Sequence, residues 1–195
     1  MKLVRVIGIA LCALSLTACA NRIESKEDAA RAMQRIGAAG NAAGNRQGQL
    51  PGPAAGQELS ITVPGKTGTA TVTIKAIEAT ADGLKLTEQI VYKEFSADGE
   101  NTLDGTLDLV ITAKFEFTDT TGSATIVMAM KGTVEMTGEY DSTVSFDLRM
   151  TSSTNDLRNQ SGATIKVVMD GTVTADGKTF TYDNETIAVE TVKAS

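Results

Sequence analysis

Residues 103–117 read LDGTLDLVITAKFEF, and this stretch decides the fold. Apolar or small side chains occupy its odd-numbered positions from Leu103 to Phe117, whereas most even-numbered positions are polar, as at Asp104, Thr106 and Lys114. A period of two places successive side chains on opposite faces of an extended strand. The stretch therefore predicts a long β-strand with one apolar face and one polar face.

The same period continues on both sides of this strand. Apolar rows run from Ala70 to Ala76 and from Ala124 to Met136, and further rows follow in 144–150 and 165–173. Turn signals separate the rows, and three of them are Asp-Gly pairs, which tolerate the positive φ angles of hairpin turns. Because no helical period follows residue 58, the pattern predicts an all-β fold. We expect an antiparallel up-and-down meander of about eight strands.

The apolar face of such a meander must be covered. We expect the sheet to close into a barrel, lipocalin-like in architecture only, or to form a strongly curled sheet. Glycines at 105, 132 and 171 interrupt the apolar rows and favour sharp coiling. Membrane barrels carry aromatic girdles, whereas this chain has no Trp and three Tyr, so we place the apolar face inside. Side chains that could line an interior cavity are Leu107, Leu109, Ile111, Phe115, Phe117, Ile126, Met128, Met130, Met136, Phe146, Met150 and Met169.

The register of the two central strands can also be predicted. A four-residue loop at 119–122, with Gly122 in the left-handed position that ends a type I turn, pairs Phe117 with Ala124 and Phe115 with Ile126. Each large side chain then faces a smaller or more adaptable one. A register shift of one residue would expose an entire row of apolar side chains to water.

The N-terminus has the layout of a signal peptide. Lys2 and Arg5 precede an apolar run from Val6 to Leu16, and this run is shorter than the about 20 residues that a spanning helix needs. We therefore expect a secretion signal over residues 1–18, a lipidated N-terminal region over 19–57 and a β domain over 58–195.

Leu16-Thr17-Ala18-Cys19 resembles the lipobox of bacterial lipoproteins. The resemblance implies cleavage after Ala18 and attachment of diacylglycerol and fatty acyl chains such as palmitate to Cys19. Ala20 stands where an aspartate often retains lipoproteins in the inner membrane, so the resemblance also implies sorting to the outer membrane of a Gram-negative bacterium. It leaves the leaflet open.

A short helix and a tether are expected between the lipid and the β domain. Ser25 is a suitable N-cap, acidic residues follow it, and apolar residues recur at helical spacing over 26–36. Gly37 would end the helix, which either packs on the β domain or frays. Residues 37–57 are rich in Gly, Ala, Asn, Gln and Pro, which predicts a flexible tether with an average span of about 25 Å. We expect removal of 20–57 to leave stability nearly unchanged.

The amino-acid composition argues against several classes of partner and catalytic site. Loss of the signal leaves 16 basic and 24 acidic side chains, a net charge of −8, which disfavours nucleic acid as a partner. Cys12 leaves with the signal, so no disulfide can form, and the absence of His excludes every Ser-His-Asp site. The segment 98–104 is rich in oxygen ligands but lacks EF-hand spacing. We predict no metal and no cofactor.

These observations favour a non-enzymatic, membrane-anchored lipoprotein of the periplasm or cell surface, whose β domain binds an apolar small molecule. The alternative is a structural or assembly module that binds another envelope protein through its sheet edge or its Thr-rich face. An enzyme that uses a pair of carboxylates is the most remote option.

Overall fold

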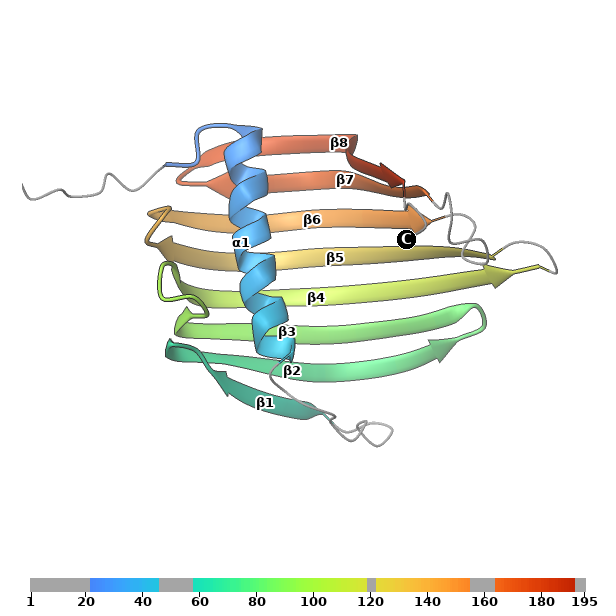
Figure 1. Ribbon diagram of the computed structural model, residues 1–195, viewed down its shortest axis with the longest axis horizontal. Coiled ribbons are helices and arrows are strands. Elements are labelled where there is room, and N and C mark those ends of the chain that lie inside the picture. The colour runs from blue at the N-terminus through green and yellow to red at the C-terminus, as the bar shows by residue number, and fades with distance from the viewer. Residues whose placement is uncertain (1–21, 46–57, 119–121, 155–163, 192–195) are drawn as a thin grey trace, which may run out of the picture.

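The fold is one helix followed by eight strands. The computed structural model describes residues 22–45, 58–118, 122–154 and 164–191. Its elements are α1 (Lys26–Asn45), β1 (Leu59–Pro64), β2 (Thr67–Thr80), β3 (Gly83–Ser96), β4 (Thr102–Phe117), β5 (Gly122–Thr137), β6 (Ser142–Thr154), β7 (Thr164–Ala175) and β8 (Lys178–Thr191). The strands form a single antiparallel sheet in which each strand pairs with its neighbour in the sequence, and α1 crosses one face of it (Figure 1).

This topology confirms the predicted all-β, up-and-down meander. The sheet is not closed into a barrel, because β1 and β8 form its two edges. The structure is instead the second of the two predicted forms, an open, curled sheet. Because β1 has six residues, it could form few backbone hydrogen bonds with the 14-residue β8. Instead of closure, α1 supplies the second layer that an apolar sheet face requires.

The predicted register of β4 and β5 is wrong by two residues. Phe117 lies opposite Gly122, and Phe115 lies opposite Ala124. The face of the sheet on which each side chain lies is nevertheless as predicted, because a register shift of two residues leaves every side chain on the same face. Two glycines fix the observed register where the strand backbones approach each other closely. A Cβ at Gly105 would lie 2.2 Å from the Thr133 carbonyl oxygen, and one at Gly132 would lie 2.1 Å from that of Thr106.

A β-bulge in β2 changes the second half of its apolar row. Ile74 lies opposite Glu88, but after the register shift Ala76 lies opposite Thr87 and Ile77 opposite Leu86. Ala76 therefore lies on the polar face, and the prediction that it continues the apolar row is wrong. The extra residue of the bulge brings Ile77 onto the apolar face in its place.

The helix begins as predicted and ends later. The Ser25 Oγ accepts a hydrogen bond from the Asp28 backbone N at 3.1 Å, while the Asp28 Oδ2 accepts one from the Ser25 backbone N at 3.2 Å. This reciprocal capping box fixes the start, and the Ser25 side chain holds the pKa of Asp28 below its usual value. The predicted end at Gly37 is wrong, because α1 continues to Asn45. Ala39 is buried against the sheet, and such packing offsets the low helix propensity of the glycines.

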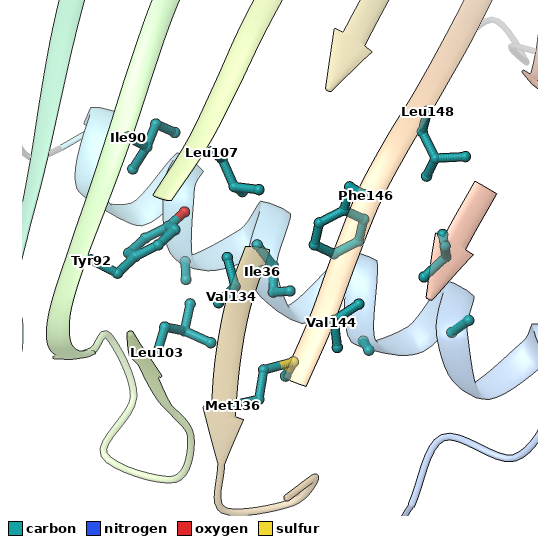
Figure 2. Packing of buried hydrophobic residues seen from close by; sticks show 14 of the residues in the cluster. Ile36, Ile90, Tyr92, Leu103, Leu107, Val134, Met136, Val144, Phe146 and Leu148 are labelled. Carbon is teal, nitrogen blue, oxygen red and sulfur yellow. The ribbon is translucent and has the colours of Figure 1, made fainter. Parts of the chain in front are cut away.

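The helix packs on the sheet through small side chains and two isoleucines. Its contribution to the core consists of Ala29, Ala32, Ile36 and Ala39, preceded by Ile23. Figure 2 shows Ile36 beside Val134 and Val144 of the sheet. Surface ion pairs join the start and the middle of the helix to the sheet, from Lys26 to Glu185 at 2.5 Å and from Arg35 to Glu139, just after β5, at 2.8 Å. Because these pairs are solvent-exposed, the apolar contacts contribute most of the stability of this interface.

Candidate functional site

The sheet has an inner face, which α1 crosses, and an outer face. All twelve side chains predicted to line an interior lie on the inner face, since each lies in a cross-strand row with buried core residues or alternates along its strand with residues that do. They line one face of an open sheet instead of the inside of a closed barrel. Those that are buried are Leu107, Leu109, Met136, Phe146 and Met169.

The helix covers only part of this face. A helix is about 10–12 Å wide, whereas β4 and β5 have 16 residues each and are therefore about 53 Å long. Figure 1 shows α1 crossing nearer to one end of the strands, where β3 connects to β4 and β5 to β6. The opposite part of the inner face extends well beyond the helix.

We call this remaining part the uncovered half-face. Its side chains, which are half-buried or exposed, are Ile77, Ala79, Leu84, Leu86, Ile111, Ala113, Phe115, Phe117, Ile126, Met128, Met150 and Val167. Phe117 is 60% exposed, Ile77 46%, Phe115 45%, and Leu84 and Ile126 are each 42% exposed. Single exposed apolar residues are common, but a contiguous apolar patch across six strands is typical of an interaction surface.

Methionines form the border between the covered and uncovered parts. Met128 lies opposite Met150, which in turn lies opposite Met169, so three adjacent strands each contribute a thioether to one row. Met130 lies one row closer to the helix. Met169 is buried, and the other three are half-buried. Flexible, polarisable side chains at this position can adapt to apolar groups of varied shape.

A carboxylate that the sequence analysis did not single out also lies on this border. Glu88 stands on the inner face between Ile74 of β2 and Leu109 of β4. Its row could have been found in the sequence, because Leu84, Leu86, Ile90 and Tyr92 share its even parity.

The environment of Glu88 is unfavourable for a charge. The side chain is half-buried, burial raises the pKa of its carboxyl, and no hydrogen bond or ion pair to it forms within the described residues. Burial, and to a lesser extent the charge of Glu88, raises the pKa of Tyr92. Figure 2 shows the Tyr92 hydroxyl directed along the sheet toward Leu107, beneath the helix. Tyr92 is therefore neutral at physiological pH and cannot neutralise Glu88.

The outer face differs in chemistry. Hydroxyl side chains pair across its strands, from Thr62 to Thr71 at 2.9 Å, from Thr133 to Ser145 at 2.8 Å and from Thr174 to Thr179 at 3.0 Å. Ion pairs join neighbouring strands on the same side, as between Lys131 and Asp147 at 3.4 Å. The outer face is thus polar, and several of its hydroxyl and charged groups are paired across neighbouring strands.

The remaining candidate features have local explanations. Asp98 Oδ1 accepts hydrogen bonds from the backbone N of Glu100 at 2.8 Å and of Asn101 at 3.1 Å, so this carboxylate organises the turn between β3 and β4. Within the described ranges, no three metal-ligating side chains gather into a cluster. Over the same ranges, no helix has the length and apolar character to span a membrane. Cys19 lies outside the described residues.

Comparison of the chain with protein-family models, with curated proteins and with solved structures gives no match. No relative therefore supplies site residues for this chain. Its most distinctive surface is the uncovered half-face, bordered by the methionine row and Glu88.

Proposed function

We propose that this chain is an exported lipoprotein, anchored through Cys19, which binds an apolar molecule on the uncovered half-face and catalyses no reaction. The anchor rests on the resemblance of residues 16–19 to a lipobox. The binding function rests on one observation: the apolar inner face of the sheet continues for several rows beyond the helix that covers it.

Physical chemistry supports binding at this surface. Burial of apolar surface contributes about 25 cal/mol per Å², and Phe115 and Phe117 each offer a large ring that the fold leaves about half exposed or more. A folded protein gains nothing in stability from such exposure. An apolar ligand that lies along β4 and β5 would cover both rings and the methionine border.

The binding experiment uses the mature chain with Cys19→Ser and a fluorescent fatty acid as the probe. Phe117→Ser and Ile126→Ser should each weaken probe binding about tenfold or more, because each removes apolar contact area at the proposed surface. Val127→Ser is the matched control, since Val127 is the chain neighbour of Ile126 but points to the outer face. Equal affinities for all four proteins would contradict the proposed binding surface.

Native mass spectrometry of the same chain purified from its own host provides an independent readout. A co-purifying apolar molecule should appear as a mass adduct, and this adduct should be lost from Phe117→Ser. An adduct that all variants retain equally would place the ligand elsewhere.

The alternative is an assembly module that binds another envelope protein by its sheet edge or Thr-rich face. This alternative has less support. The β8 edge contains register shifts and Asn184 at φ 47°, and it carries Asp183 and Glu185, which are features that discourage strand addition. Six of the outer-face hydroxyl groups are engaged in the three cross-strand pairs described above.

A further inference from the structure

The distribution of charge on the inner face indicates what class of ligand it suits. Beyond the part buried under α1, the described inner-face residues of β2 to β7 include one ionisable group, Glu88, and the uncovered half-face itself has none. Lys85, Lys114 and Lys166 alternate with apolar residues and so point to the outer face. Across β2 to β7, a ligand on the inner face would therefore meet an apolar surface with one negative charge at its border. In β8, Glu185 lies opposite Met169, and its carboxylate is already paired with Lys26 of α1.

From these observations, and resting on the proposed function, we propose that the ligand is an amphiphile whose cationic head group pairs with Glu88 and whose alkyl chain lies along β4 and β5 toward Phe117. The available length fits such a chain. From Leu109, which is opposite Glu88, to Phe117 the strand extends about 27 Å. One leaflet of a bilayer core, which is the length of a lipid acyl chain, is about 15 Å thick.

Glu88 also argues against a second copy of this chain as the occupant. Stacking two uncovered half-faces up to their borders would bury two carboxylates. No basic residue on the inner face of β2 to β7, within the described residues, could pair with them. Burial of unpaired charges is strongly unfavourable. An ammonium head group, by contrast, supplies the missing partner.

The test compares two probes with the same decyl chain, decyltrimethylammonium and decyl sulfate, both below their critical micelle concentrations. Calorimetric titration of the mature chain carrying Cys19→Ser should give at least tenfold tighter binding of the cation. Glu88→Gln should remove most of this preference while leaving decyl-chain binding in place. Glu116→Gln is the matched control, because it removes the same charge from the outer face of β4 and should retain the preference.

The outcomes separate this inference from the proposed function. Equal affinity for the two probes, or an equal loss of preference in Glu88→Gln and Glu116→Gln, would overturn the role of Glu88 while decyl binding still supported the apolar site. Failure of both probes to bind the parent chain, or unchanged binding in Phe117→Ser, would overturn the apolar site itself. A dimer in native mass spectrometry that Phe117→Ser dissociates would assign the half-face to a second copy and contradict the ligand proposal.

Discussion

At the scale of single residues, glycines have opposite roles in the sheet and in the helix. Gly132 has φ 146°, and a Cβ there would lie 2.1 Å from the Thr106 carbonyl oxygen. Gly37 lies within α1, with no atom within 4 Å of the place that a Cβ would take. The first position requires glycine, whereas the second merely tolerates it.

We therefore expect Gly132→Ala to destabilise the protein by more than about 2 kcal/mol, because both the backbone angle and the close approach exclude a side chain. Gly37→Ala should stabilise it by about 0.5–1 kcal/mol, since alanine is the better helix former. Urea denaturation measures both changes. A neutral effect of Gly132→Ala would show that β4 and β5 do not approach each other as described.

Glu88 gives a prediction of pH dependence. Burial raises the pKa of its carboxyl above the ordinary value of 4.5. Between the ordinary pKa of the unfolded chain and the raised pKa of the folded protein, the folded protein therefore binds a proton more readily. Stability from this residue should therefore rise as the pH falls through the raised pKa, and the gain should be complete below about 4.5. Ile74 and Leu109 flank Glu88 without charge, and Tyr92 stays neutral over this range.

The measurement is the urea midpoint of the parent chain and of Glu88→Gln between pH 4 and pH 8. The other carboxylates contribute equally to the pH dependence of stability in both proteins. The difference between the two urea midpoints therefore reports the contribution of Glu88. We expect Glu88→Gln to be the more stable protein at neutral pH and to lose its advantage as the pH falls. A pH-independent difference would mean that Glu88 is solvated like a surface carboxylate.

At the scale of elements, the helix belongs to the folded core. The expectation that residues 20–57 contribute little to stability loses its basis, because Ile23, Ala29, Ala32, Ile36 and Ala39 are buried against the sheet. We expect Ile36→Ala to cost about 2–5 kcal/mol in denaturant unfolding, through lost burial and the cavity left behind. Arg31→Ala on the exposed side of α1 is the control and should change stability by less than about 1 kcal/mol. Equal effects of the two changes would contradict the packing of α1 on the sheet.

The strands could be predicted from the sequence because alternation is a local property. Alternation within 103–117 and within 124–136 predicts which residues of each strand share a face. The structure confirms both predictions. The register between the rows was predicted two residues off, since a turn preference at Gly122 is weaker than the close approach of strands at Gly105 and Gly132. The bulge before Ala76 has no clear signal in the sequence.

Two further features depend on contacts between distant segments. The end of α1 at Asn45 reflects packing of Ala39 against the sheet, which helix propensity alone does not reveal. Closure was unpredictable for the same reason, because it depends on whether β1 meets β8. Glu88 was predictable in principle from the parity of Leu86 and Ile90, but its place at the border of the helix was not.

At the scale of the whole molecule, burial of Ile23 changes the expected distance from the membrane. If Cys19 carries lipid, only four residue steps separate it from Ile23, which spans at most about 14 Å. The sequence alone predicts a tether of about 25 Å over residues 37–57. Residues 37–45 belong instead to α1, and residues 46–57 lie outside the described residues. With α1 packed on the sheet, a lipid on Cys19 would instead hold the end of the sheet near β8 close to the bilayer, since Lys26 contacts Glu185 there.

We expect Cys19→Ser to release the protein from membranes and to abolish labelling by a radioactive fatty acid, because a multiply acylated cysteine provides stable attachment. Membrane fractionation and labelling of cells that express either form measure both effects. Cys12→Ser, within the signal, is the matched control and should leave both unchanged. Continued sedimentation of Cys19→Ser with membranes would contradict the anchor.

The central claim is that an apolar chain binds the uncovered half-face and not the core beneath α1. Methyl NMR of isoleucine and methionine tests it directly, with decyltrimethylammonium added to the mature Cys19→Ser chain. We predict chemical-shift changes concentrated at the methyl groups of Ile77, Ile111, Ile126, Met128 and Met150. The methyl chemical shifts of Ile36 and Ile61 should stay unchanged. Changes that are spread evenly over these methyl groups, or that are confined to Ile36 and Ile61, would contradict the account.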